Sequence, residues 1–414
     1  MDNWKIIMYI TALDIGTSQI KVLVARPEKG GKLSLAAVFK APSAGIRKGE
    51  IINVGELVQA LKPVIDGIKQ VDKAASKNIF VNIGGGNIRI QNSRGIVAVS
   101  RADSEICSED VERAIKASQA INLGPNRMIV HTITKEFIVD GIGDIVDPLG
   151  MVGNRLEVNS LIVDCFKPSL NNLVKALEAS GGKIGGIIYN PLASARSVLN
   201  KNQKELGVAL IDIGFGTTNL AVYQEGKLVS TATFPIGASH ITNDLAIGLR
   251  CPIKTAEKIK LSFGAADSKE VSGKEKIDLH ELDESLNSTV NKRFISEIIE
   301  IRLNEIFELV NADLKLINKN GELPSGAVIV GGGGKMSGVL ALAKKELKLP
   351  VQAGEVETQG IEFPNDESAK EVEDPEFAVA AGLLLLGVEQ SFESGGWSIS
   401  KNNWLSKILS HLLP

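Results

Sequence analysis

Short apolar runs that lead into Asp-Ile-Gly and hydroxyl residues occur twice in the chain and predict its main strands. Residues 208–211 are apolar, and Asp212, two glycines and two threonines follow them. Residues 12–18 show the same order, with Asp14 inside the run. In both copies a second apolar run and a Gly-Lys-Leu turn come next. The repeat predicts two similar domains, each built on a strand, a tight turn and a returning strand.

Strand-like and helical patterns alternate over most of the remaining chain. Apolar residues at helical spacing predict a helix over residues 55–70, and residues 79–83 predict a buried strand. Residues 87–163 differ, because short strands there surround one predicted helix, so we expect a compact inserted subdomain. The acidic stretch 364–375 predicts a polar loop. Alternating strands and helices indicate a layered α/β fold.

The C-terminal part combines an apolar run with an amphipathic tail. Residues 377–388 are too short to span a bilayer and predict a buried helix, and we expect residues 389–396 to be a short linker. Residues 403–413 predict a helix with one apolar half. Such a short helix is marginal in water, so it should fold on its own domain, a partner or a membrane. The Gly-Gly linker and two tryptophans favour the membrane, through Trp397, Trp404, Leu405, Ile408, Leu409, Leu412 and Leu413.

Composition places the chain among soluble globular proteins. It has 414 residues, of which 44% are hydrophobic and 23% charged, enough for two to four domains. A net charge of −3 gives no support for nucleic-acid binding, so we expect no nucleic-acid partner. The three cysteines are isolated, which fits a reducing compartment, and the N-terminus lacks the pattern of a signal peptide.

The repeated turns carry the chemistry of a phosphate site. Their glycines leave backbone N–H groups uncovered, and these groups with the hydroxyls can cradle phosphate oxygens. An aspartate at the strand end can hold Mg²⁺ through water. A single turn of this kind is equally well a plain β-hairpin, but two matched turns favour a nucleotide cleft between the domains. The glycines at 331–334 follow an apolar run and predict bare backbone on which a nucleotide can lie.

Two further features have two interpretations each. Asn190 opens a predicted helix after a strand, so it either faces a γ-phosphate or simply precedes Pro191 at a helix start. Glu257 and Lys260 are three residues apart and share one helix face. They either grip the ribose of an adenosine or form a solvated charged surface.

Taken together, the motifs resemble those of the actin-like ATPase superfamily and, within it, the bacterial cell-division FtsA family. The resemblance covers essentially the whole chain. Its most specific stretch runs from Val139-Asp140-Gly141 to residues 147–157, which is similar to the signature of the family's inserted subdomain. Residues 190–195, 241–249 and 256–260, and a tail that opens Gly-Gly-Trp, also follow the family.

This resemblance implies an α/β actin-like fold, a duplicated ribonuclease-H-type fold with two lobes and a C-terminal amphipathic helix. The four subdomains are called 1A, 1C, 2A and 2B. We expect 1A at 1–86 and 164–201, 1C at 87–163, 2A at 202–230, 2B at 231–304, 2A and the return to 1A at 305–388, the linker at 389–396 and a membrane-targeting helix at 397–414.

The resemblance also implies ATP and Mg²⁺ between the lobes, with Asp14 and Asp212 holding the metal through water. It implies actin-like filaments on the inner face of the cytoplasmic membrane at the division site. Subdomain 2B would capture the C-terminal peptide of tubulin-like FtsZ, with Arg302 as a candidate contact, and 1C would recruit later division proteins. The implied nucleotide-binding residues are Asp14, Gly16, Thr17, Ser18, Lys21, Asp212, Gly214, Gly216, Thr217, Thr218, Glu257, Lys260, Gly332, Gly333 and Gly334.

Three departures from the family pattern bear on catalysis. Phe215 stands where glycine is usual, and Asn219 stands where aspartate is usual. Asn190 occupies the position of the glutamate that places the attacking water in the related MreB. Because asparagine cannot act as a general base, we expect at most weak ATP hydrolysis.

Three alternative functions remain. A pilus-assembly protein like PilM has the same fold but lacks this tail. A small-molecule kinase of the superfamily needs a base near Asn190, and no aspartate presents itself there. A chaperone like DnaK needs a peptide-binding domain, and too little chain follows residue 386.

Overall fold

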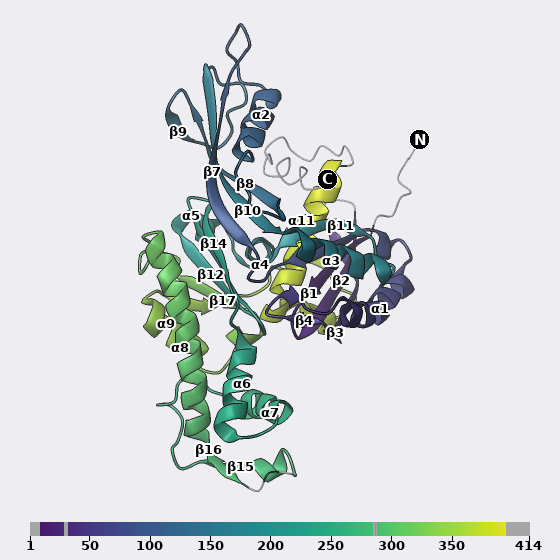
Figure 1. Cartoon of the computed structure of the whole chain (residues 1–414), viewed down its shortest axis with the longest axis vertical. Helices are drawn as coiled ribbons and strands as arrows, with labels where there is room; N and C mark the ends of the chain where they lie inside the picture. The colour runs from purple at the N-terminus through teal and green to yellow at the C-terminus, as the bar shows by residue number, and fades with distance from the viewer. Residues whose placement is uncertain (1–8, 29–31, 285, 287, 395–414) are drawn as a thin grey trace.

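The structure is a computed structural model that describes residues 9–28, 32–284, 286 and 288–394. Two α/β lobes form its centre, a narrower part projects upward and a helical part projects downward (Figure 1). Each lobe contains one sheet, and the two sheets share a connectivity. The predicted repeat is therefore confirmed at the level of secondary structure.

In the first lobe the strands are ordered β11-β6-β1-β2-β3-β19. Strands β1 to β3 form an antiparallel meander, and β6 and β11 extend it in parallel. The short strand β19 lies on the outer edge. Their bounds are β1 Ile10–Ile15, β2 Gln19–Pro27, β3 Leu33–Pro42, β6 Ile79–Ile83, β11 Ile184–Tyr189 and β19 Ile361–Glu362.

The second lobe repeats this arrangement in the order β14-β13-β12-β17-β18. Here β12, β13 and β14 form the meander, and β17 and β18 are the parallel strands. Their bounds are β12 Val208–Ile213, β13 Thr218–Gln224, β14 Lys227–Phe234, β17 Ala327–Val330 and β18 Val351–Ala353.

Two helices, α4 (Asn190–Val198) and α11 (Ala378–Ser394), pack between the two sheets. They share one apolar core with inward-facing residues of β1 and β12. The predicted helix at 377–388 is thus confirmed, and its apolar residues face both lobes. Helices α1 (Val54–Val71) and α3 (Lys167–Ala179) cover the other face of the first sheet.

The outer face of the second sheet carries α8 and α9, and the same core continues into α6 and α7 in the downward projection (Figure 1). There the short hairpin of β15 and β16 lies near the start of α8. The bounds are α6 Ala238–Leu249, α7 Ile253–Phe263, α8 Lys292–Leu316, α9 Val339–Leu347, β15 Lys276–Asp278 and β16 Thr289–Asn291.

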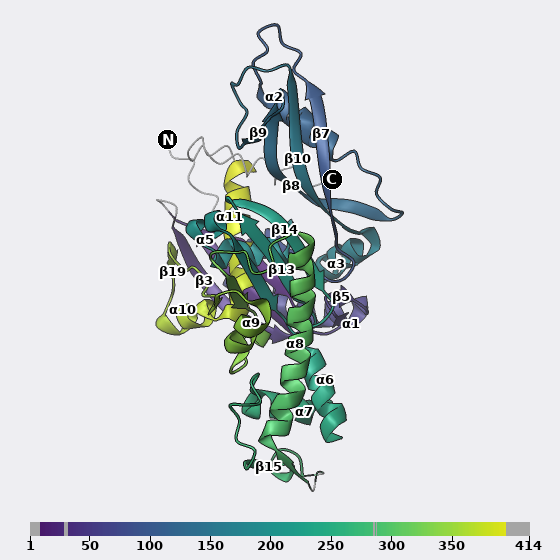
Figure 2. The same ribbon diagram turned by 90° about the vertical axis from the view of Figure 1, so that its left-hand side faces the viewer.

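A four-stranded antiparallel sheet forms the upper projection, in the order β7-β10-β8-β9, with α2 packed on one face (Figure 2). The predicted short strands include one long strand, β8, which pairs with β10 over its whole length with two register shifts. The bounds are β7 Arg89–Ala98, α2 Ser108–Ser118, β8 Arg127–Val139, β9 Ile142–Ile145 and β10 Arg155–Phe166.

Two expectations about the C-terminal third are wrong. The polar loop at 364–375 contains a helix, α10 (Asp366–Glu373), which begins because the Asn365 side chain accepts the N–H of Ser368. The linker is helical as far as Ser394, since α11 continues and its Glu389 pairs with Arg196 of α4 at 2.7 Å. Of the helices that the structure describes, none is both long and apolar enough to cross a membrane. The expected amphipathic tail lies outside the described residues.

Candidate functional site

The two repeated turns have the same backbone geometry. In the first, the N–H of Gly16 donates to the carbonyl of Gln19 at 3.0 Å, and in the second the N–H of Gly214 donates to that of Thr217 at 2.9 Å. The turns approach each other closely, because a Cβ on Gly216 would lie 2.5 Å from Thr17 Oγ1. Only glycine fits at that position without a shift of one turn.

A cavity of about 680 Å³ opens between the lobes at these turns. It is lined by most of the predicted nucleotide-binding residues, which come from both lobes. They are Asp14, Gly16, Thr17, Ser18, Lys21, Asp212, Gly214, Gly216, Thr217, Glu257, Lys260, Gly332 and Gly333, and Asn190 joins them.

Two predicted residues do not line the cavity. Thr218 is buried, and its hydroxyl donates to the carbonyl of Ile236 at 2.9 Å. Gly334 packs on β17, where a Cβ would come within 2.9 Å of Ile329. The preceding glycines form a 3₁₀ turn at Gly332–Lys335, and α9 starts only at Val339. The glycines therefore lie in this 3₁₀ turn and not at the N-terminus of α9.

The two aspartates at the turns are buried and face the same cavity. Asp14 accepts from Lys21 Nζ at 3.2 Å and from Asn82 Nδ2 at 2.8 Å. Asp212 has a weaker partner, Asn219 Nδ2 at 3.4 Å. Burial and the charge of Asp14 together raise the pKa of Asp212 to about 6. Burial lowers the pKa of Lys21, but the carboxylate of Asp14 outweighs it, and the net shift is upward.

This donor set fits Mg²⁺ held through water. Magnesium is commonly bound by one or two carboxylates together with waters and substrate phosphates. Two buried carboxylates that repel each other would be relieved by a divalent cation. Among the described residues, no group of three or more His, Cys, Asp or Glu side chains has the spacing of an all-protein metal site.

Glu257 and Lys260 form a paired wall of the cavity. Lys260 Nζ lies 2.7 Å from Glu257 Oε2 and 2.9 Å from Thr242 Oγ1, and Lys260 is only 4% exposed. Its ammonium also stands 5.3 Å from the centre of the Phe215 ring. Burial lowers the pKa of Lys260, opposed by Glu257. The ring of Phe215 thus packs against this cation.

Several cavity residues were not found from the sequence. Asn82 bridges the first turn, because its Oδ1 accepts the N–H of Ile15 at 2.7 Å while its Nδ2 holds Asp14. A polar residue inside an apolar strand was the available signal. Lys335 and Glu376 meet at 3.0 Å on the wall formed by the 3₁₀ turn. Their pairing joins segments 41 residues apart, so local sequence gave no signal.

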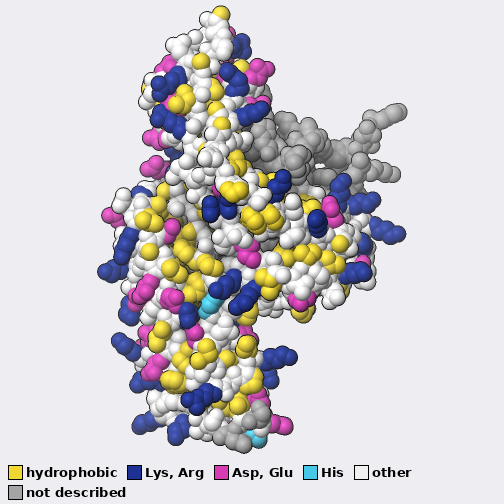
Figure 3. Space-filling view, viewed as in Figure 1, with side chains coloured by type: hydrophobic (Ala, Val, Ile, Leu, Met, Phe, Trp, Pro, Cys, Tyr) yellow, Lys and Arg dark blue, Asp and Glu magenta, His cyan; other side chains and the backbone are white. Residues whose placement is uncertain are grey.

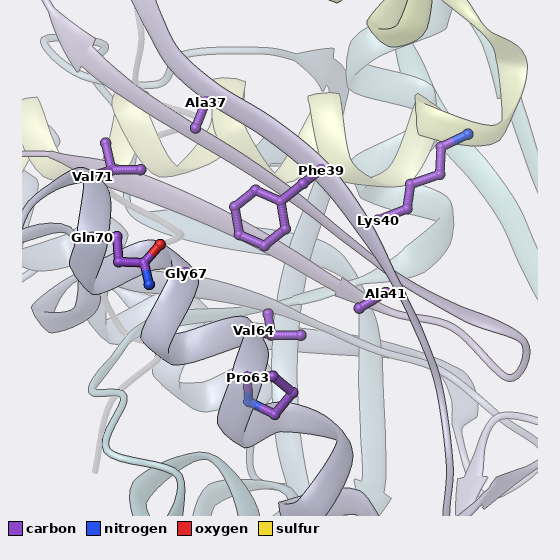
Figure 4. Close-up of a pocket in the computed structure, with 9 residues that line it drawn as sticks. All are labelled: Ala37, Phe39, Lys40, Ala41, Pro63, Val64, Gly67, Gln70 and Val71. Atoms are coloured by element: carbon purple, nitrogen blue, oxygen red, sulfur yellow. The ribbon is translucent and has the colours of Figure 1, made fainter.

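Two other predicted positions lie elsewhere. Arg302, on α8, is not among the residues that line the cavity, and its guanidinium pairs with Asp244 of α6 at 2.6 and 2.9 Å. The seven predicted membrane residues of the tail are outside the described part of the chain. A second cavity of about 480 Å³ lies between β3 and α1 and contains no predicted site residue (Figure 4). Its Phe39 points into the groove, whereas Lys40 points away.

Comparisons with known proteins agree with this architecture. A family model described as "Cell division protein FtsA" matches residues 209–382, and one described as "SHS2 domain inserted in FTSA" matches residues 85–164. The cell division protein FtsA of Pseudomonas aeruginosa is 33% identical over 397 residues, which cover 96% of this chain and 93% of that protein. The FtsA of Bacillus subtilis is 36% identical over 377 residues, covering 91% and 82%.

Solved structures share the fold at low sequence identity. A chain of the PilM-PilN type IV pilus biogenesis complex superposes with a TM-score of 0.64 at 16% identity, over 93% of this chain and 99% of that one. MreB5 of Spiroplasma citri bound to ADP gives a TM-score of 0.56 at 13% identity, over 94% and 99%. These likenesses show an actin-like fold.

Proposed function

Because the chain belongs to the FtsA family of cell division proteins, we propose that it binds ATP between its lobes and links division filaments to the membrane. One observation carries the nucleotide part. Both Asp-Ile-Gly turns open onto one cavity, and the bare backbone of Gly332 and Gly333 lines the same space. Turns with free N–H groups suit phosphates, and glycine backbone suits the flat face of a nucleoside.

In this proposal each lobe supplies one half of the phosphate site. Thr17 and Ser18 face it from the first lobe, and Gly216 and Thr217 from the second. Asp14 and Asp212 would hold Mg²⁺ through water, and the metal would neutralise phosphate charge. Glu257 and Lys260 would contact the ribose or adenine. MreB5 of Spiroplasma citri, which shares this fold and binds ADP, supports a nucleotide at this place.

Hydrolysis is proposed to be slow at best. Asn190 lines the cavity, and its Oδ1 is buried without a hydrogen-bond partner among the described residues. A neutral amide can orient a water molecule but cannot accept its proton. ATP would therefore act mainly by holding the two lobes together.

We propose that the subdomains follow the family plan, with 1A and 2A as the central lobes, 1C as the upper projection and 2B as the lower one. Two proposed boundaries, at 230 and 304, fall inside β14 and α8. Filament formation, recruitment of later division proteins through 1C and a location at the division site on the cytoplasmic membrane face belong to the same proposal. A pilus-assembly role like that of PilM or a kinase role has no specific observation in its favour.

For FtsZ we propose contact with the lower projection. Figure 3 shows apolar side chains at the surface there. Ile247 on α6 and Ile301 on α8 are both more than two-thirds exposed. Arg302 lies beside Ile301, and its pairing with Asp244 fixes the guanidinium between these helices. An apolar segment would find an apolar partner on this surface, and an acidic group would pair with Arg302 in exchange for Asp244 or Glu305, which both hold its guanidinium.

Flotation on liposomes tests the membrane link. The full chain should float with vesicles of bacterial lipid and should carry FtsZ with it, whereas a chain ending at Glu393 should stay in the soluble fraction. Leu409→Glu, in the apolar half of the expected tail helix, should abolish flotation, and Ser406→Glu, in its polar half, is the matched control. If the full and shortened chains both remain soluble, or both float, the proposed tether is wrong.

A further inference from the structure

A buried line of hydrogen bonds leads away from Asp212 toward the upper projection. Asn219 Nδ2 donates to Asp212 Oδ2 at 3.4 Å, and Asn219 Oδ1 accepts from Thr233 Oγ1 at 3.0 Å. The same threonine oxygen lies 2.9 Å from the hydroxyl of Tyr189. Tyr189, Asn219 and Asp212 are all less than a tenth exposed. Thr233 is partly exposed, so the line is buried on either side of this residue and is shielded from most exchange with water.

The chemistry of the groups fixes the direction of every bond. A carboxylate only accepts, so the amide of Asn219 must donate to Asp212 with its nitrogen. Thr233 has one hydroxyl proton, which goes to the amide oxygen, so Tyr189 donates to Thr233. Burial raises the pKa of Tyr189 to about 12, which keeps that proton in place. All donors point toward Asp212, an arrangement in which each bond polarises the next.

The line crosses from one lobe to the other. Tyr189 ends β11 in the first lobe, whereas Thr233 and Asn219 lie on β14 and β13 in the second. The next residue after Tyr189 is Asn190, which lines the cavity. The contact between the Tyr189 and Thr233 hydroxyls thus joins the lobes close to the cavity. On the first lobe, Tyr189 directly precedes a residue that lines the cavity. On the second lobe, two hydrogen bonds connect Thr233 to the carboxylate of Asp212.

The upper projection contacts both lobes, in the first lobe at Tyr189 itself and in the second at the far end of the strand that carries Thr233. His131 of β8 accepts the backbone N–H of Tyr189 at its Nε2, at 3.0 Å. On the second lobe, Lys227 at the start of β14 pairs with Asp144 of β9 at 3.0 Å. Both views show β8 reaching down to the central lobes (Figures 1 and 2). A change in the angle between the lobes must therefore strain or relax the attachment of β8.

We propose that Tyr189, Thr233 and Asn219 are positioning residues that couple ligand binding at Asp212 to the attachment of the four-stranded upper sheet. This inference rests on the proposed binding of ATP. A ligand held by both turns favours the closed arrangement of the lobes, and closure keeps the Tyr189–Thr233 contact formed. Because His131 accepts the backbone N–H of Tyr189, the Tyr189–Thr233 contact also stabilises the position of β8. Occupancy of the cavity would then be transmitted to the surface on which further molecules assemble.

Hydrogen–deuterium exchange of the full chain, with and without Mg·ATP, tests the coupling. In the wild type, ATP should slow exchange in the turns at 14–21 and 212–219, and should slow exchange in β8, residues 127–139, by about fivefold or more. Tyr189→Phe removes one hydroxyl and keeps the ring. It should leave the turns protected by ATP and reduce the effect on β8 to less than about twofold. Tyr223→Phe, on the neighbouring strand β13, is the matched control and should behave like the wild type.

A second pair of variants guards against misfolding. Thr233→Val removes the hydroxyl at constant size and should also uncouple β8, while Thr233→Ser restores the hydroxyl and should restore the effect. A purely structural role would speed exchange in β8 equally with and without ATP, leaving the ATP effect intact, and would overturn the inference. The inference would also be overturned if ATP slowed hydrogen–deuterium exchange in the turns of the wild-type protein but not in β8. If the turns themselves do not respond, the proposed ATP site fails and the coupling fails with it.

Discussion

The buried histidine at the base of the upper projection should make the protein sensitive to mild acid. His131 is 1% exposed, and its Nδ1 has no hydrogen-bond partner among the described residues. Burial lowers its pKa to about 3, from an ordinary value of 6.5. The folded pKa is depressed, so the unfolded chain takes up the proton first as the pH falls. Stability is therefore complete above pH 6.5 and is lost progressively between 6.5 and 3.

The linkage relation gives the size of this loss. With these two pKa values, lowering the pH from 7.5 to 5.0 should cost about 2 kcal/mol from His131 alone. His131→Gln keeps an acceptor for the N–H of Tyr189 but cannot take up a proton in this range. Its free energy of unfolding should therefore fall by about 2 kcal/mol less than that of the wild type over the same interval.

Urea unfolding followed by circular dichroism at several pH values measures the difference. Effects of the carboxylates are shared by both proteins and cancel in the comparison. His280→Gln, at an exposed position, is the matched control for the exchange itself. Parallel pH curves for the wild type and His131→Gln would refute the reasoning, because they would mean that water or a rearrangement solvates this histidine when it is protonated.

Three further predictions concern the cavity and the core. Gly216→Ala should weaken ATP binding at least tenfold, because its Cβ would press on Thr17 at 2.5 Å. Gly55→Ala in α1 is the control and should leave the affinity unchanged, because no neighbour lies nearer than 3.4 Å to the new Cβ. Equal affinities of the two variants in isothermal titration would contradict this. Gly382→Ala should lower stability by about 3 kcal/mol or more, since the new Cβ would lie 1.8 Å from the carbonyl of Ala193 and force α11 off α4; an unchanged urea midpoint would count against the packing. Asn190→Asp adds a carboxylate of equal size and should raise phosphate release by about tenfold or more, and a rate that stays at background would show that this position does not face the attacking water.

Local signals made the two turns predictable. An apolar run followed by Asp-Ile-Gly specifies a buried strand and a tight turn within a dozen residues. Strand β12 begins at Val208 as the pattern predicts, whereas β1 begins earlier than predicted, at Ile10. The twin copies also indicated that the turns belong to one site. The structure brings both to a single cavity, as the duplication predicted.

Features that depend on packing between distant segments could not be predicted in this way. The burial of Lys260 requires α7 to stack on the turn that carries Phe215, and the contact of Tyr189 with Thr233 requires two lobes to meet. By contrast, α10 carried a readable signal. Asn365 followed by Asp366 and Glu367 is a helix start, but the acidic composition suggested a loop.

Thermal unfolding with Mg·ATP, combined with a phosphate-release assay, tests directly whether the two turns bind ATP and hydrolyse it slowly. At about 100 times its dissociation constant, ATP bound to the folded state adds about 2.7 kcal/mol, which corresponds to an increase in Tm of roughly 3 °C for a chain of 414 residues. The account predicts this increase in the wild type, its loss in Gly216→Ala, and phosphate release near background. An unchanged Tm, an increase that Gly216→Ala retains in full, or brisk turnover would contradict it.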